Sequence, residues 1–235
     1  MSQKYKRILL KISGEALAGE SKFGIDFETL KPLAKVIKNC SESGVQIAIV
    51  VGGGNFWRGR TSGNMNRVKA DHMGMLATVI NAIGLSDALE EQGVKSRVMT
   101  SIAIPQVGEL YSPEKAIKHL EKGKVVIFGY GTGNAFFSTD TAASLRAAEI
   151  QAEIIFKATN VDGVYDSDPS KNPDAKKYSD ITFKEVLAKN LNVIDSTAAS
   201  MCRDNDISLL VFSMKDPNNI SKAINGENLG TVVHP

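Results

Sequence analysis

The chain has 235 residues, of which 43% are hydrophobic and 23% are charged, and these proportions exclude a disordered or fibrous protein. Its 28 Lys and Arg residues nearly balance 26 Asp and Glu residues, and the resulting net charge of +2 argues against a dedicated nucleic-acid-binding surface. A chain of this length buries roughly 70% of its unfolded surface, so it needs no disulfide or structural metal.

Two cysteines, Cys40 and Cys202, stand far apart without a CxxC pair. We therefore expect two reduced thiols in a cytoplasmic protein rather than a zinc or dithiol site. The first apolar run, residues 8–10, is too short for the core of a signal peptide. The longest uncharged stretches, 72–86 and 125–139, are too short and too polar for membrane spans.

Short apolar runs alternate with segments of helical period from the start of the chain. Residues 7–13 and 45–51 predict strands, and the unbroken apolar character of the second suits a parallel sheet covered on both faces. Residues 26–43 predict a helix, because apolar residues recur on one face: Leu30, Leu33, Ala34, Ile37 and Cys40. Pro32 lies inside this span and favours a later start.

The next segments continue the alternation. Residues 64–92 predict a long helix that is broken near Gly84, and residues 96–101 predict a third strand. Residues 112–114 (Ser-Pro-Glu) combine an N-cap, a proline at the first helical position and an acidic first turn, so they predict the start of a helix that ends at Gly123.

The second half of the chain has the same pattern. Residues 125–129 and 153–159 predict strands around a helix at 140–150, and residues 161–181 predict a long loop or small hairpin. Two short helices, a strand at 207–213, a helix near 217–224 and a final strand at 230–234 complete the chain.

Strands that alternate with helices predict an α/β fold: a three-layer αβα sandwich around a mainly parallel sheet. We expect residues 1–235 to form one continuous domain with two sub-lobes. Ligands of such sheets bind beyond the carboxyl ends of the strands. The loops after the strands at 7–13, 45–51, 125–129 and 153–159 are therefore the candidate sites.

Three of these four loops are rich in glycine. They are Lys11-Ile12-Ser13-Gly14, then Gly52-Gly53-Gly54-Asn55 followed by Arg58 and Arg60, and then Gly129-Tyr130-Gly131-Thr132-Gly133-Asn134. A single such loop is explained by a sharp strand–helix turn. Three loops at one sheet edge favour a site where backbone N–H groups surround an anion.

Several catalytic fingerprints are missing from the sequence. Walker A, the dinucleotide pattern GxGxxG, the protein-kinase HRD and DFG motifs and the hydrolase GxSxG are all absent. The three histidines, His72, His119 and His234, are far apart, which argues against a zinc site or a Ser-His-Asp triad.

Phosphoryl transfer needs positive charge, aligned oxygens and little covalent help, and two lysines could supply the charge. Lys11 and Lys157 each lie near the end of an apolar strand, either on an exposed edge or facing an anion. Asp140 is either a helix N-cap or a carboxylate that orients the two ammonium groups. Asp168 and Asp195 are either loop and cap residues or parts of the site.

Six segments and a closing Gly-Thr near residue 230 resemble the amino acid kinase superfamily, and within it they are most similar to the bacterial-type uridylate kinases. The segments are KRILLKISGEAL (6–17), FGID (23–26), GGGNFWRG (52–59), MNRVKADHMGMLATVINAIGLSDAL (65–89), GTGNAFFSTDTAASLRA (131–147) and KATNVDGVYDSDP (157–169). The resemblance covers essentially the whole chain.

This resemblance implies that ATP phosphorylates UMP to give UDP and ADP in pyrimidine nucleotide biosynthesis, with Mg²⁺ held mainly by the nucleotide phosphates. The catalytic residues implied are Lys11, Arg58, Asp140 and Lys157. The ATP-binding residues implied are Lys11, Ile12, Ser13, Gly14, Gly54, Arg58, Thr159, Asn160, Tyr165 and Asp168. The UMP-binding residues implied are Gly53, Asp71, Thr132, Gly133, Asn134, Ala135, Phe136, Phe137, Ser138 and Thr139, and Asp195 is a further candidate.

The resemblance also implies an acceptor-binding sub-lobe at roughly 1–150, an ATP-binding sub-lobe at roughly 151–235, and a homohexamer activated by GTP and inhibited by UTP. The segment matching the GTP-response region is Gly19, Glu20, Ser21, Lys22, Phe23 and Gly24. Two alternatives remain open at this stage: an amino-acid kinase that makes an acyl phosphate, and a nucleotide-binding regulator or storage protein without turnover.

Overall fold

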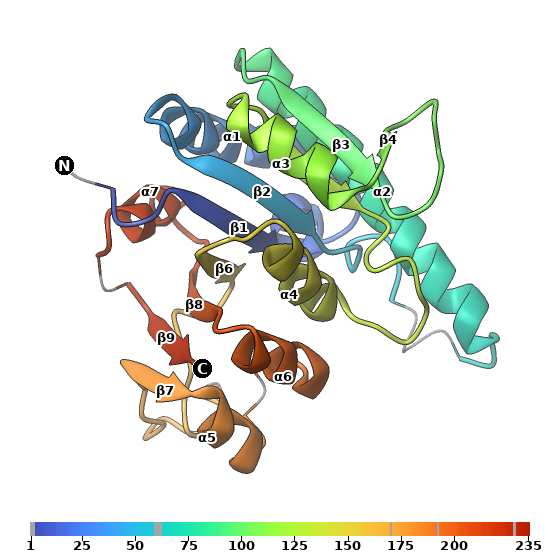
Figure 1. Cartoon of the computed structure of the whole chain (residues 1–235). Coiled ribbons are helices and arrows are strands. Elements are labelled where there is room, and N and C mark those ends of the chain that lie inside the picture. The colour runs from blue at the N-terminus through green and yellow to red at the C-terminus, as the bar shows by residue number, and fades with distance from the viewer. Residues whose placement is uncertain (1–2, 59–62, 170, 192, 228) are drawn as a thin grey trace.

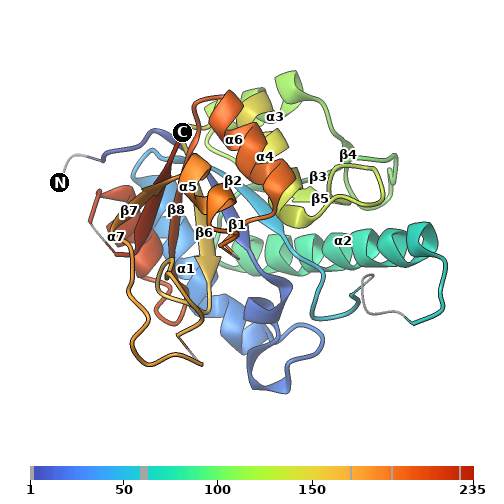
Figure 2. The ribbon, with the colours of Figure 1, turned by 90° about the horizontal axis from the view of Figure 1, so that it is seen from below.

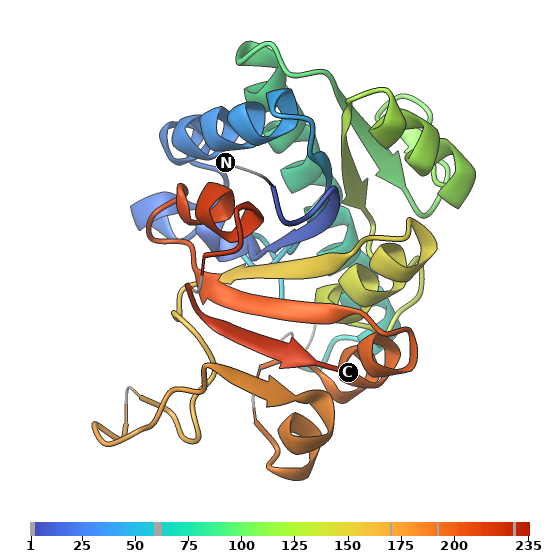
Figure 3. The ribbon, with the colours of Figure 1, turned by 60° about the vertical axis from the view of Figure 1, so that its left-hand side comes forward.

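A central β-sheet organises the computed structural model, which describes residues 3–58, 63–169, 171–191, 193–227 and 229–235. Within these ranges the sheet has nine strands in the order β4-β3-β5-β2-β1-β6-β8-β9-β7 (Figures 1 and 3). The strands are β1 (Arg7–Ile12), β2 (Gln46–Val51), β3 (Ser96–Thr100), β4 (Glu109–Leu110), β5 (Val125–Gly129), β6 (Ile154–Thr159), β7 (Asp180–Thr182), β8 (Ser208–Ser213) and β9 (Thr231–His234).

The strand pairs are parallel except for β8 and β9, which pair antiparallel. Parallel neighbours require crossover connections, and helices supply most of them. The helices are α1 (Phe27–Glu42), α2 (Arg67–Glu91), α3 (Pro113–Glu121), α4 (Thr139–Glu149), α5 (Phe183–Ala188), α6 (Ser196–Asp204) and α7 (Asn219–Ile224). The predicted α/β class and mainly parallel sheet are confirmed.

Helices cover both faces of the sheet, and each face has its own apolar core. One core packs α1, α2 and α7 against the sheet, and the other packs α3, α4, α5 and α6 against the opposite face. Figure 2 shows α1 and α2 on one side of the strands and α3, α4 and α6 on the other. In β1, Ile8, Leu10 and Ile12 face the first core and Leu9 faces the second. Lys11 therefore faces the side covered by α4.

Two predictions, one about where a helix starts and one about a break within a helix, were wrong. Helix α1 begins directly after its N-cap Asp26 and continues through Pro32. The cap and the buried face stabilise its first turns, although Pro32 has no backbone N–H to donate to the helix. Helix α2 is continuous through Gly84. A Cβ atom there would lie 2.7 Å from Ile25 Cδ1, so this glycine allows close packing rather than ending the helix.

The sequence missed several short elements. These are β4, β7 and two 3-10 turns at Gly14–Leu17 and Gly19–Ser21. The 161–181 segment is mostly loop, with an antiparallel bridge between Tyr165 and Lys177, and its end forms β7. Across the described residues, no helix is both long enough and apolar enough to cross a membrane.

Candidate active site

Strands β1 and β6 lie side by side in a register that pairs Lys11 with Lys157. Both side chains face α4, and only 12% and 14% of their side-chain surfaces are exposed. Neither strand is at an edge of the sheet, so the edge-strand interpretation of these lysines is wrong. Two ammonium groups on neighbouring strands repel each other and therefore need an anion between them.

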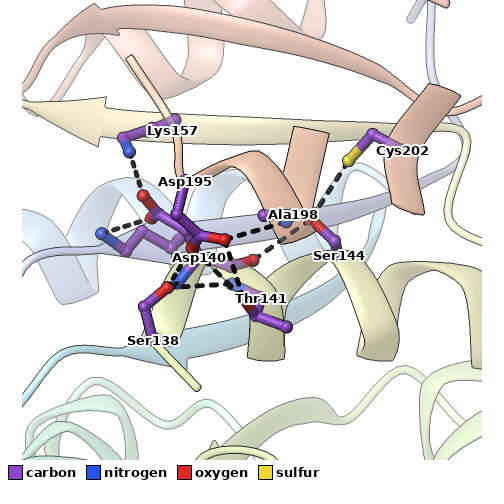
Figure 4. Close-up of polar contacts among 9 residues, drawn as sticks. Ser138, Asp140, Thr141, Ser144, Lys157, Asp195, Ala198 and Cys202 are labelled. Atoms are coloured by element: carbon purple, nitrogen blue, oxygen red, sulfur yellow. Dashed lines mark hydrogen bonds and ion pairs between the residues drawn. The ribbon is translucent and has the colours of Figure 1, made fainter. Parts of the chain in front are cut away.

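Asp140 supplies this anion from the first turn of α4. Its Oδ1 lies 2.9 Å from Lys11 Nζ, and its Oδ2 accepts a hydrogen bond from Lys157 Nζ at 2.5 Å (Figure 4). The N-cap of α4 is Ser138, whose Oγ accepts from the backbone N–H of Asp140 at 3.0 Å. The N-cap interpretation of Asp140 is therefore wrong.

The charges in this cluster are strongly coupled. Burial raises the pKa of Asp140, but the ammonium groups of Lys11 and Lys157 outweigh burial and hold that pKa below its ordinary value. Burial lowers the pKa of Lys157; Asp140 opposes this shift and Lys11 reinforces it. Taken by themselves, these three side chains carry a formal charge of +1, and their two ammonium groups can attract an anion.

Asp195 connects this cluster to α6. It is the N-cap of α6 and accepts from the backbone N–H of Ala198 at 2.9 Å. Its carboxylate also accepts from Ser138 Oγ and, at 3.1 and 3.2 Å, from Thr141 Oγ1 (Figure 4). The cap interpretation of Asp195 is confirmed, and the same side chain fixes the first turn of α4, which carries Asp140.

A cavity of about 450 Å³ opens on one side of Lys11. It is lined by Gly53, Asp71, Thr132, Asn134, Phe136, Phe137, Ser138 and Thr139 from the predicted UMP set. Gly133 and Ala135 belong to the same loop but are not among the lining residues. Besides Lys11, four residues of the predicted ATP set line this first cavity: Ser13, Gly14, Gly54 and Arg58.

Two ion pairs in the first cavity were not anticipated. Arg67 Nε donates to both carboxylate oxygens of Asp71, at 2.8 and 2.9 Å, and the Phe136 backbone N–H donates to Asp71 Oδ2 at 2.8 Å. The i,i+4 spacing of Arg67 and Asp71 is a sequence signal that could have identified this pair. Glu15 pairs with Arg58, and no local pattern links residues 43 positions apart.

A second cavity of about 530 Å³ lies on the other side of the lysine pair. Thr159, Tyr165 and Asp168 from the predicted ATP set line it together with Lys157, and Lys11 lines both cavities. Asn160 is exposed and is not among its lining residues. The sequence missed the contribution of the loop between α5 and α6, where residues 189–191 and Val193 line this cavity.

Other predicted residues lie outside both cavities. The Ile12 side chain is fully buried in the core, so any contact of this residue with a ligand would be through its backbone. Residues 19–24 form a surface turn next to the second glycine loop: Asn55 Nδ2 donates to the Gly24 carbonyl at 2.6 Å, and the rings of Phe23 and Phe56 meet edge to face. Arg60 lies outside the described residues.

Comparisons with known proteins agree with this geometry. A family model described as the amino acid kinase family matches residues 6–213. A UMP kinase from Bacillus anthracis is 36% identical, with a TM-score of 0.94 over 98% of this chain and 96% of that one. A UMP kinase from Ureaplasma parvum is 41% identical, with a TM-score of 0.93 over 99% and 100% of the two chains. A uridylate kinase from Archaeoglobus fulgidus is 29% identical, with a TM-score of 0.73 over 96% and 99%.

Proposed function

We propose that this chain, which belongs to the amino acid kinase family, is a UMP kinase. It would transfer the γ-phosphoryl group of ATP to UMP, giving ADP and UDP in pyrimidine nucleotide biosynthesis. The observation that carries the proposal is the Lys11–Asp140–Lys157 cluster, which lies where two cavities meet. Two solved UMP kinases match nearly the whole chain, which favours UMP over an amino-acid acceptor.

The transfer needs no covalent intermediate on the protein. An oxygen of the UMP phosphate attacks the γ-phosphorus of ATP, and the bond from that phosphorus to the β–γ bridging oxygen breaks, leaving its electron pair on ADP. Lys11 and Lys157 would stabilise the charge on the equatorial oxygens of the moving group. Asp140 would hold both ammonium groups in place, and Arg58 would contact a phosphate with its guanidinium group.

The two cavities suit the two substrates. The first would hold UMP, with Asp71 at the ribose hydroxyls and residues 132–139 around the nucleotide. The second would hold the adenosine of ATP beside Thr159, Tyr165 and Asp168. Ser13, Gly14 and Gly54 line the first cavity close to Lys11, so we place them at the phosphates between the substrates. This division supports an acceptor-binding sub-lobe at roughly 1–150 and an ATP-binding sub-lobe at roughly 151–235.

We include Mg²⁺ as part of the ATP substrate. Among the described residues, no group of three or more His, Cys, Asp and Glu side chains could hold a metal ion, and Asp140 is already paired with two lysines. These side chains fit an ion that is carried mainly by phosphate oxygens, which Mg²⁺ prefers.

The proposal extends to a homohexamer in the cytoplasm that GTP activates through residues 19–24 and UTP inhibits. Residues 19–24 contact the second glycine loop through Asn55, which offers a route to the first cavity. Apolar side chains exposed on α2 support self-association: Met73, Leu76, Ile80 and Ile83. The two buried, unpaired cysteines suit a reducing compartment.

A coupled ADP-release assay tests the proposed function. The acceptors are UMP, CMP, AMP, GMP, N-acetylglutamate, glutamate and aspartate, each with and without GTP. We expect ADP release with UMP. Release with an amino acid alone would replace the proposal with an acyl-phosphate kinase, and UMP binding without ADP release would replace it with a non-catalytic nucleotide-binding protein.

A further inference from the structure

The loop that follows β5 has an unusual backbone. Tyr130, Gly131, Gly133 and Phe136 all have positive φ angles, of 66°, 55°, 89° and 73°. Glycine adopts this region freely, but Tyr130 and Phe136 are strained in it. Such a backbone persists only when surrounding groups hold it, so its anchors decide the shape of one wall of the first cavity.

Helix α2 holds both ends of this loop. The backbone N–H of Tyr130 donates to Thr78 Oγ1 at 2.8 Å, and the backbone N–H of Phe136 donates to Asp71 Oδ2 at 2.8 Å. These contacts leave the glycine-rich middle to be fixed from elsewhere. There, Ser101 Oγ donates to the Gly131 carbonyl at 2.7 Å, and the Ser101 side chain also lies against Gly133.

A buried arginine stands behind Ser101. Arg146, in the last turn of α4, is only 4% exposed. Its Nη2 donates to Ser101 Oγ at 3.0 Å and reaches the Gly131 carbonyl at 3.4 Å. The guanidinium group thus supports the loop both directly and through the Ser101 hydroxyl. Connected hydrogen bonds of this kind, from Arg146 to Ser101 to Gly131, strengthen one another.

The remaining contacts of Arg146 hold the guanidinium group in one orientation. Its Nη1 donates to Glu149 Oε2 at 2.5 Å, and its Cζ lies 3.9 Å from the centre of the Tyr111 ring. Tyr111 Oη donates to the same Glu149 oxygen at 2.6 Å. A planar group held by an ion pair and an aromatic face presents its other N–H donors in fixed directions.

We propose that Arg146 is a positioning residue that fixes the 130–137 loop in the shape that receives the acceptor nucleotide; the proposal rests on the assignment of UMP to the first cavity. A buried ion pair is weak evidence for stability, because well-packed apolar side chains often serve as well. What an apolar residue cannot supply is the donor that holds Ser101 and Gly131. Within the part of the chain that the structure describes, Arg146 makes no hydrogen bond or ion pair with Lys11, Asp140 or Lys157, so we expect its loss to act on acceptor binding rather than on the transfer step.

Kinetics of two variants test this inference. In Ser101→Ala the Arg146–Glu149 pair is intact and only the direct contact of Arg146 with the Gly131 carbonyl remains. In Arg146→Met both this contact and the hydrogen bond from Arg146 to Ser101 are lost. We expect the KM for UMP to rise about tenfold or more in Arg146→Met, and less in Ser101→Ala, since 1.4 kcal/mol of lost hydrogen bonding is a factor of ten. We expect kcat and the KM for ATP to change less than about threefold.

The matched controls are Arg203→Met and Ser43→Ala. Arg203 is also an arginine in the last turn of a helix with a carboxylate neighbour, but it is exposed; Ser43 caps α1 away from both cavities. Both should keep wild-type constants. A fall in kcat at an unchanged KM for UMP in Ser101→Ala and Arg146→Met would overturn the inference.

Hydrogen exchange on the free protein gives a readout that does not depend on the substrate. Amides of residues 130–137 should exchange faster in both variants than in the wild type, while amides of α1 stay unchanged. Unchanged exchange in this loop, or faster exchange throughout the protein, would overturn the positioning role. Faster exchange confined to the loop, together with a wild-type enzyme that does not phosphorylate UMP, would leave Arg146 as the anchor of the loop and refute only the assigned substrate.

Discussion

Lys11 and Lys157 meet across two parallel strands in an arrangement that a protein selected only for stability would avoid. Asp140 relieves the repulsion by pairing with both ammonium groups. The polar groups around it form a connected set, because Asp195 binds both Ser138 and Thr141 in the first turn of α4. Like charges that face each other inside a protein and are neutralised by a nearby carboxylate are typical of functional sites.

Lys11→Ala tests the transfer role directly. The Lys157–Asp140 pair survives in this variant, so the fold should remain intact. We expect kcat to fall by a factor on the order of 100 or more, the usual effect of losing one preorganised charge from a transition state. The measurement is steady-state kinetics together with thermal unfolding. Lys35→Ala, at an exposed position of α1, is the control, and an unchanged kcat in Lys11→Ala would refute the role.

Asp195→Asn probes the charge state of Lys157. Burial already lowers the pKa of Lys157, and the negative charge of Asp195 is among the groups that raise it. Asparagine keeps the helix cap and removes that charge, so the pKa of Lys157 should fall further. Because only the protonated lysine stabilises the transferring group, the alkaline loss of kcat should begin at a lower pH than in the wild type. A pH–rate profile measures this, and an unshifted alkaline limb would contradict it.

The junction between β2 and α2 shows how elements approach each other closely enough to form the first cavity. A Cβ atom at Gly53 would lie 2.6 Å from the Gly74 carbonyl oxygen, 3.0 Å from Ala77 Cβ and 3.2 Å from the Thr78 nitrogen. Two of these three atoms are backbone atoms, which cannot rotate away. The glycine is therefore required for the distance between loop and helix, whatever its role toward a ligand.

Gly53→Ala should therefore destabilise the protein by about 1–3 kcal/mol, the usual effect of overpacking. Gly74→Ala is the matched control. Its added Cβ would be 3.8 Å from the nearest atom, Trp57 O, and helix propensity favours alanine over glycine by about 1 kcal/mol. Urea denaturation should move the two midpoints in opposite directions. A Gly53→Ala midpoint equal to that of the wild type would contradict the packing argument.

Helices α1 and α2 also explain two wrong predictions. Pro32 and Gly84 are both unfavourable inside helices, and local rules therefore placed a late start and a break at them. Both helices continue because long apolar faces pack on the sheet and on each other, and the chain at Ile25 fills the space that Gly84 leaves. Burial of a whole face outweighs one weak residue.

In the molecule as a whole, the two cavities are built from different parts of the chain. Apart from Lys11, the first is lined by residues between Ser13 and Thr139, and the second by residues between Lys157 and Val211. Among the described residues, Lys11 is the one that lines both. We therefore expect a substitution in the lining of one cavity to have little effect on the binding of a ligand in the other.

Thermal shifts with separate ligands test this division. A ligand that binds only the native state stabilises it by about 2.7 kcal/mol at one hundred times its Kd. Asp71→Ala should lose most of the Tm increase caused by UMP and keep that caused by a non-hydrolysable ATP analogue, whereas Tyr165→Ala should do the reverse. Each variant serves as the control for the other. Loss of both shifts in either variant would contradict two separately built cavities.

Much of this arrangement could be predicted from the order of strands and helices along the chain. Alternating strands and helices predicted the parallel sheet, because local periodicity reports which face of each element is buried. Because ligands of such sheets bind beyond the carboxyl ends of the strands, we expected Lys11, Lys157 and the glycine loops to lie together at that edge. The family resemblance, now confirmed, supplied the substrates and the residue roles, which remain proposals.

Contacts between distant residues were decided only by the packed structure. Three features give no signal in the local sequence, because each depends on how whole layers pack. They are the pairing of Glu15 with Arg58, the wall of the second cavity at residues 189–191 and Val193, and the support of the 130–137 loop by Arg146. Periodicity specifies which face of an element is buried. It does not specify which side chain from another element lies opposite, and these long-range pairs give the site its geometry.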